Sequence, residues 1–304
     1  MPWQNIPLND DTGTSIPGVA FGTAFIPDPT ALVEQALELG FSHVDTAQNY
    51  LDEAEVGLGV RQSGLPRSEV FVTTKFSGGG PQKLSIKASA KESLAKLGLT
   101  YVDLYLIHWP QYAVPDIPSA WKELEDIKAA GQARSIGVSN FSVADLTLLL
   151  ASATVKPAVN QISLNPYNYA AQKPIIEFSK KNGIVVEAYS PLIPLRRPGG
   201  PLDKPLSSIA AAHKATPEQI LLAWSKAKGA VPVTTSSKKE RLVGYLAAGD
   251  IELSEEDIAA IDEAGAKGLP SSLVGVHRRS LGKVGALLAF VLLLGWAKTR
   301  CLSV

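Results

Sequence analysis

Short apolar runs alternate along the chain with segments of helical periodicity. Runs such as VFVTT and LYLIH are almost continuously apolar, which is typical of parallel strands that helices cover on both faces. Strands that alternate with helices in this way predict a parallel sheet. The predicted strands are residues 18–23, 42–47, 70–75, 103–108, 134–139, 158–163, 183–189 and 230–235.

The segments between these strands carry helix-start signals. Ser142, Thr216 and Ser254 each precede an aspartate or glutamine by three positions, the pattern of a capping box. A chain of about eight strand–helix units with no linker near its middle favours closure of the sheet over an open, doubly wound arrangement. The sequence therefore predicts an α/β protein, a single-domain (β/α)8 TIM barrel.

One interval departs from the regular spacing. Between Tyr189 and Ala230 the chain carries several prolines and a Gly-Gly pair, which predict a long loop. Long loops in compact barrels are usually functional, although a tolerated surface insertion would look the same.

Composition narrows the class of protein. The chain has 304 residues, with 45% hydrophobic and 19% charged residues. Its 29 basic and 29 acidic residues balance, so no global charge attracts nucleic acid. Cys301 is the one cysteine, which excludes an internal disulfide and a thiolate zinc site, and we expect no metal centre. No secretory pattern begins the sequence, so we expect a globular cytoplasmic enzyme.

Polar side chains stand at the ends of several predicted strands. In a parallel barrel the carboxyl ends of the strands meet at one rim, where chemistry collects. A single lysine or histidine there would usually be structural, but several converging groups indicate a site. These groups are Asp45 with Tyr50 beyond it, Lys75, His108, Ser139, Asn140, Gln161 and Tyr189.

Four of these segments resemble the signature blocks of aldo-keto reductases. GFSHVDTAQNYLDEAEVG, VFVTTKF, DLYLIHWP and SIGVSNF occur in the order of that family, and the similarity runs from about Gly18 to Lys267. Residues 231–242 (VPVTTSSKKERL) lie where the family binds the adenosine end of its cofactor. This segment is similar to that of the fungal aldehyde- and ketoamide-reducing branch. The resemblance implies a barrel that binds a nicotinamide cofactor without a Rossmann domain. It also implies a catalytic tetrad of Asp45, Tyr50, Lys75 and His108.

Physical chemistry supports these implied roles. Reduction of a carbonyl places negative charge on oxygen, so a proton donor must lie beside that oxygen. We expect Lys75 to lower the pKa of Tyr50, the donor, and Asp45 to keep Lys75 charged. His108 would hydrogen-bond the substrate oxygen. The family's steroid double-bond reductases carry glutamate there, so His108 favours ordinary carbonyl reduction.

The resemblance also assigns cofactor contacts. Ser139, Asn140 and Gln161 match positions that bind the nicotinamide carboxamide, and Tyr189, followed by Ser190, matches the aromatic under the ring. Ser236, Ser237, Lys238 and Arg241 are candidates for the 2′-phosphate, which favours NADPH over NADH. Tyr245 departs from the family, where asparagine is common. A solvated basic helix start would give the same residues.

The substrate end is less defined by the sequence. Trp109, Phe25 and Phe76 are candidate walls of an apolar pocket for a small aldehyde or ketone, and each could equally be a core residue. The natural carbonyl compound and the oligomeric state are not determined.

The C-terminal tail is unlike the rest of the chain. We expect a barrel domain over residues 1–270 and a tail over 271–304, with an uncharged apolar segment at 284–297. As a helix that segment would span about 21 Å, short of a hydrocarbon core of roughly 30 Å. It could be a membrane anchor, an interfacial helix or a lid, and Cys301 is a weak lipidation candidate.

If the tail links the chain to a membrane, a second function also fits the sequence. The family includes cofactor-binding regulatory subunits of potassium channels, which could retain the tetrad. The leading hypothesis is nevertheless NADPH-dependent reduction of aldehydes or ketones with Tyr50 as general acid.

Overall fold

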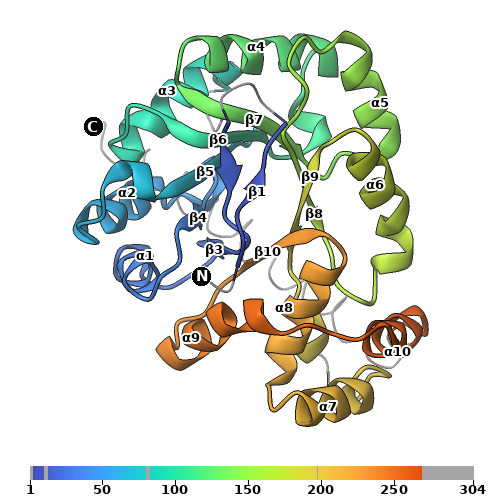
Figure 1. The fold of residues 1–304 in the computed structure, drawn as a ribbon. Coiled ribbons are helices and arrows are strands. Elements are labelled where there is room, and N and C mark those ends of the chain that lie inside the picture. Colours follow the sequence, from blue (N-terminus) through green and yellow to red (C-terminus); the bar gives the residue numbers. More distant parts are fainter. Residues whose placement is uncertain (1–2, 10–12, 80–82, 197, 269–304) are drawn as a thin grey trace, which may run out of the picture.

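The computed structural model describes residues 3–9, 13–79, 83–196 and 198–268. Eight parallel strands close into a barrel in the order β10-β3-β4-β5-β6-β7-β8-β9, and helices surround it (Figure 1). The barrel strands are β3 (Ala20–Gly22), β4 (His43–Asp45), β5 (Phe71–Phe76), β6 (Val102–Ile107), β7 (Ala133–Ser139), β8 (Val159–Ser163), β9 (Val185–Tyr189) and β10 (Ala230–Thr234). The predicted fold class is confirmed, and each predicted run contains or closely overlaps one barrel strand.

The helices begin where the capping signals indicate. Complete capping boxes occur at Ser142, Thr216 and Ser254, the N-caps of α5, α8 and α10. The helices are α1 (Pro29–Glu38), α2 (Glu53–Gln62), α3 (Ile86–Leu97), α4 (Ile117–Ala129), α5 (Val143–Ser152), α6 (Tyr169–Lys181), α7 (Asp203–Ala212), α8 (Pro217–Ala227), α9 (Lys239–Ala247) and α10 (Glu255–Ala266).

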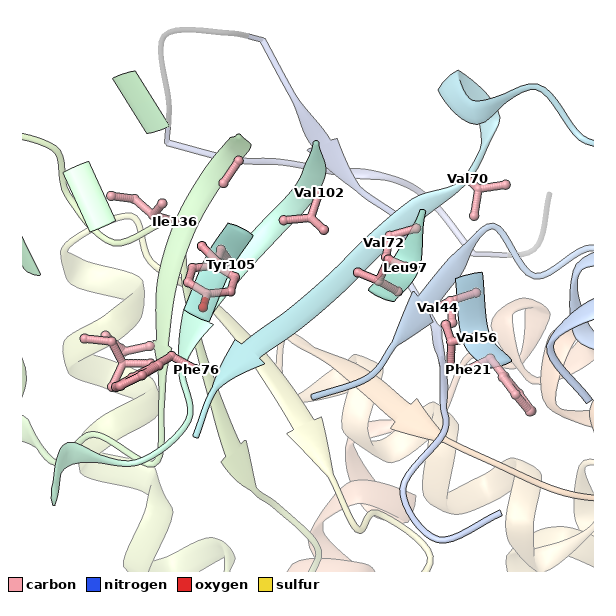
Figure 2. Packing of buried hydrophobic residues seen from close by; sticks show 14 of the residues in the cluster. Phe21, Val44, Val56, Val70, Val72, Phe76, Leu97, Val102, Tyr105 and Ile136 are labelled. Atoms are coloured by element: carbon pink, nitrogen blue, oxygen red, sulfur yellow. The ribbon is translucent and has the colours of Figure 1, made fainter. Parts of the chain in front are cut away.

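The main hydrophobic core lies between the barrel and the helices. Figure 2 shows part of it, with Phe21, Val44 and Val72 of the strands among the side chains that pack there. Val56 of α2 and Leu97 of α3 are both fully buried in the same core. This packing holds the strands in place, so that their carboxyl ends form a rigid rim.

An N-terminal hairpin, which the sequence did not predict, closes the other end of the barrel. Its strands are β1 (Ile6–Pro7) and β2 (Ser15–Ile16), and β1 crosses the barrel in Figure 1. Ile16 is fully buried and belongs to one hydrophobic cluster with Leu104 and Leu106 of β6. Strands of two residues are too short to show an alternating pattern, which explains why they were missed.

The long interval after β9 contains both a loop and an unpredicted helix. The chain forms the short 3-10 helix η4 (Ile193–Arg196) and then α7 before reaching α8. The apolar segment 284–297 and Cys301 lie outside the described residues. Within the described part of the chain, no helix has the length and apolar character needed to cross a membrane.

Candidate active site

A cavity of about 470 Å³ opens at the carboxyl ends of the barrel strands. Asp45, Tyr50, His108, Gln161 and Tyr189 line it, although they come from five separate segments of the sequence. The predicted convergence of polar groups is therefore present in the structure.

Lys75 and Asp45 form a buried ion pair at the base of this site. The Lys75 Nζ atom donates to Asp45 Oδ1 at 2.6 Å and to the Thr46 carbonyl oxygen at 2.9 Å. The Lys75 side chain is 0% exposed and that of Asp45 is 3% exposed. Burial alone would lower the pKa of Lys75, but the charges of Asp45 and Tyr50 outweigh it and raise this pKa to about 12. Lys75 therefore stays an ammonium.

Tyr50 lies against that ammonium. It ends the 3-10 helix η1 (Gln48–Tyr50), and the Lys75 Nζ atom is 5.2 Å from the centroid of its ring. Burial raises the pKa of Tyr50 above its ordinary value, and Lys75 opposes that rise. Lys75 thus lowers the pKa of Tyr50 as expected, but removal of the phenol from water outweighs the nearby cation, so the net shift is upward.

His108 is neutral because of its surroundings, and it is oriented by Ser77, a residue that sequence reasoning missed. Its Nδ1 atom is 2.8 Å from the Ser77 hydroxyl oxygen, and its ring lies edge-on to Tyr50 with 5.7 Å between centroids. Burial, with repulsion from Lys75, lowers the pKa of His108 to about 3. If the Ser77 hydroxyl donates to Nδ1, the Nε2–H of His108 is the remaining donor. No sequence pattern marks Ser77, because its partner His108 follows the neighbouring strand β6 and is distant in sequence.

Asn140 and Tyr189 hold each other at the rim. The Tyr189 hydroxyl donates to Asn140 Oδ1 at 2.9 Å, and Asn140 Nδ2 donates to the His108 carbonyl oxygen and to Ser139 Oγ. Ser139 itself does not line the cavity, because its hydroxyl donates to the Gln161 carbonyl oxygen at 2.8 Å. Ser139 also accepts from Asn140 and so supports that residue, and its direct contact with a cofactor stays a prediction.

Gln161 connects two carboxyl groups. Its Nε2 atom donates to Asp45 Oδ2 at 2.8 Å and to Glu187 Oε2 at 3.0 Å. No hydrogen bond to its Oε1 atom occurs within the described residues, so this oxygen is available as an acceptor at the cavity. Glu187 is a second residue that sequence reasoning missed, since it lies inside an otherwise apolar strand.

Backbone strain is concentrated around this cavity. Phe25, Asn140 and Ser190 line it and have φ angles of 61°, 62° and 60°, in the left-handed region. Leu51, which directly follows Tyr50, has a φ of 62°. Such conformations cost about 1–3 kcal/mol each for residues other than glycine and are typical of functional sites.

Two of the three predicted pocket walls lie at the cavity. Trp109 stacks on His108 with 6.4 Å between ring centroids, and the ring of Phe25, 94% exposed, lies 6.2 Å from that of Tyr50. Phe76 does not line the cavity. It is 3% exposed, packs edge-on against Tyr112 and lies among the core side chains of Figure 2. Its side chain points to the helix side of β5, as Lys75 points inward.

The candidate phosphate residues lie beyond the cavity, around the start of α9. Ser237, Lys238 and Arg241 are exposed, and Ser236 is buried, with its Oγ atom accepting from the Lys238 backbone at 3.0 Å. Thr235 lines the cavity, and its Oγ1 atom is buried without a hydrogen-bond partner among the described residues. An unpaired buried hydroxyl fits a site for a polar ligand group.

Comparison with known proteins agrees with this geometry. The model of the Aldo/keto reductase family matches residues 24–266. The chain is 40% identical over 256 residues to an NAD/NADP-dependent indole-3-acetaldehyde reductase of Schizosaccharomyces pombe, covering 83% of this chain and 86% of the relative. It is 37% identical over 269 residues to a morphine 6-dehydrogenase of Pseudomonas putida, covering 84% and 90%.

A solved structure of similar fold binds a dinucleotide. The crystal structure of a Bombyx mori aldo-keto reductase in complex with NADP matches with a TM-score of 0.77 at 34% identity, over 86% of this chain and 92% of that one. Sequence blocks, barrel and family model all agree. The chain therefore belongs to the aldo/keto reductase family and is an oxidoreductase that acts on carbonyl or alcohol groups.

Proposed function

We propose that this chain reduces aldehydes or ketones with NADPH and that Tyr50 supplies the proton. One observation carries the proposal. A fully buried ammonium on Lys75 lies between the Asp45 carboxylate and the Tyr50 ring, directly below a cavity that Tyr50 and His108 both line. A cation held dry beside a phenol stabilises the phenolate that proton donation leaves behind.

The reaction divides its charge between these groups. A nicotinamide cofactor held at the rim would supply the hydride for the carbonyl carbon, so that negative charge would develop on the carbonyl oxygen. Tyr50 donates its proton to that oxygen, and its phenolate is stabilised by Lys75 until solvent returns the proton. Neutral His108 donates from Nε2 to the same oxygen and orients it, while Ser77 keeps the imidazole in that tautomer.

The rim residues fit the nicotinamide end of a cofactor. The half-buried Tyr189 is positioned to stack under the ring, and its bond to Asn140 holds it there. The free Oε1 atom of Gln161 can accept from the carboxamide NH₂, and Asn140 and Ser190 border the same space. These contacts support a nicotinamide cofactor, as in the NADP complex of the similar structure.

The adenosine end supports NADPH over NADH. Lys238 and Arg241 are exposed cations at the start of α9, and neither makes an ion pair within the described residues. With Ser236, Ser237 and the unpaired Thr235 hydroxyl nearby in sequence, they provide donors suited to a 2′-phosphate. Tyr245, which replaces the usual asparagine, is 4% exposed and contributes to packing instead.

The substrate is an uncharged, apolar carbonyl compound in this proposal. Phe25 and Trp109 border the cavity above Tyr50, and both present aromatic surface to solvent. Exposed aromatic side chains at a mouth favour ligands with apolar groups.

The decisive test is NADPH oxidation with a panel of aromatic aldehydes, short ketoesters and sugars. Tyr50→Phe removes the proton donor, and we expect kcat/KM to fall about 10²- to 10⁴-fold while the Kd for NADPH is retained. Binding without turnover of any carbonyl would instead favour the regulatory-subunit hypothesis. That alternative is not favoured, because the relatives reported above carry the names of reductases and dehydrogenases.

A further inference from the structure

A second buried carboxyl group shares the site with Asp45. Glu187 lies on β9, directly beside Gln161 of β8 in the sheet register, and it is 0% exposed. The single amide nitrogen of Gln161 bonds both Glu187 and Asp45. Glu187 is therefore linked through Gln161 to the charged pair below Tyr50, although it does not line the cavity.

The charges that face Glu187 do not balance if both carboxyl groups are ionised. Lys75 of β5 is the cation, and Asp45 and His43 of β4 are the other titratable groups below Tyr50; β10, the next strand, carries no titratable residue. His43 Nε2 bonds Thr73 Oγ1 at 2.9 Å and is 3.8 Å from Glu187 Oε1. Burial and Lys75 lower the pKa of His43 to about 3, so it is neutral.

The charge of one ammonium thus acts on two buried carboxyl groups. Asp45 takes the short bond to Lys75 at 2.6 Å. Burial and the charge of Asp45 raise the pKa of Glu187 to about 8. This upward shift favours the protonated form of Glu187, in which the charges of Lys75 and Asp45 balance.

We propose that Glu187 is a positioning residue that keeps Tyr50 an effective proton donor only while Glu187 itself is protonated. This inference rests on the proposed role of Tyr50. When neutral, Glu187 accepts from Gln161 and adds no charge. When ionised, it places a second negative charge near Lys75, so the phenolate of Tyr50 forms against two carboxylates instead of one. Tyr50 then becomes a weaker acid.

The Glu187→Gln variant removes the ionisable group and keeps a side chain of nearly the same size and shape. The new amide oxygen can still accept from Gln161, but it cannot ionise. We expect Tyr50 to ionise about one pH unit lower in this variant, the size of effect that a nearby charge exerts. The measurement is the ultraviolet phenolate difference spectrum between each protein and its Tyr50→Phe version, which needs no turnover.

Kinetics provide the second readout. In the unaltered protein, kcat/KM for aldehyde reduction should fall about threefold or more as pH rises through the range in which Glu187 loses its proton. Glu187→Gln should remove that fall, and KM for NADPH should change less than kcat. Glu53→Gln is the matched control. Glu53 is also buried, with its pKa raised by burial, but it bonds Thr74 Oγ1 from α2, on the helix side of β5.

The outcomes are distinct. An unchanged Tyr50 ionisation in Glu187→Gln, or an alkaline fall that Glu187→Gln and Glu53→Gln share with the unaltered protein, would overturn the role of Glu187. If Glu187→Gln does not fold, Glu187→Met removes the same charge at similar volume and is judged by the same Tyr50 spectrum. Absence of turnover in the unaltered protein would reject the proposed function, whereas the spectrum would still decide whether Glu187 governs Tyr50.

Discussion

The barrel contains a buried carboxylate at each end, and the two are used differently. At the carboxyl end, Asp45 pairs with Lys75 below the cavity. At the amino end, Asp103 of β6 pairs with Arg67 at 2.7 Å and with Arg134 at 3.2 Å. Asp103 also accepts from the Val72 backbone at 2.9 Å.

The difference lies in the groups that the cations face. The two arginines at the amino end each stack on the Tyr101 ring at 4.2 Å, so both cations pair with Asp103 and pack on one aromatic ring, although Arg67 Nε has no hydrogen-bond partner among the described residues. At the carboxyl end, Lys75 faces Tyr50, and the Thr235 hydroxyl has no hydrogen-bond partner in the described chain. Cations that are held by a carboxylate and an aromatic ring stabilise a fold, whereas an ammonium that faces an ionisable phenol at a cavity can take part in a reaction.

Exchange of each aspartate for asparagine tests this contrast most strongly. Asp45→Asn leaves Lys75 without its counter-ion, so we expect kcat/KM to fall about a hundredfold to a thousandfold. Asp103→Asn should lower the free energy of unfolding by roughly 2 kcal/mol and leave kcat/KM within about twofold. Steady-state kinetics and urea unfolding measure both, and a large loss of activity in Asp103→Asn would break the distinction between the two ends.

A smaller effect is expected at the adenosine end. Arg241→Ala removes an exposed cation without disturbing the barrel, so KM for NADPH should rise about tenfold while KM for NADH stays the same. Lys204→Ala, on α7 outside the predicted phosphate segment, is the control. Equal changes for both cofactors would mean that Arg241 does not contact the 2′-phosphate.

Removal of the hydroxyl that supports His108 should have a smaller effect still. Ser77→Ala removes the partner of Nδ1, which frees the imidazole to change tautomer, and we expect kcat/KM to fall about threefold to tenfold. Ser77→Thr retains the hydroxyl and should recover most of the activity. A wild-type rate in Ser77→Ala would show that packing alone orients His108.

The smallest effect is expected in the pH profile, where kcat/KM should not fall on the acidic side. An ordinary histidine gains its charge near pH 6.5, but the pKa of His108 is lowered to about 3 by burial and by Lys75. Protonation therefore occurs only far below neutrality, and kcat/KM should be flat between about pH 5 and 7. A decline near pH 6.5 that disappears in His108→Gln would contradict the neutral state and the lowered pKa of this buried residue.

Prediction from sequence succeeded where the signal was local and repeated. The strand runs, the capping boxes and the barrel follow from patterns that recur within a few residues. The convergence of Asp45, Tyr50, Lys75 and His108 was also predictable, because strand topology brings these positions to one rim. The hairpin β1–β2 was missed because its two-residue strands carry no periodic signal.

The amino-acid sequence by itself determined the family, the barrel and the residue types at the rim. Only the tertiary structure decided which of those residues face the cavity: Phe76 turns into the core, Ser139 supports Asn140, and Ser77 and Glu187 join the site. It also decided the direction of the Tyr50 pKa, which burial raises despite Lys75. The physical reason is that desolvation and hydrogen-bond partners depend on groups that are distant in sequence and meet only when the barrel closes.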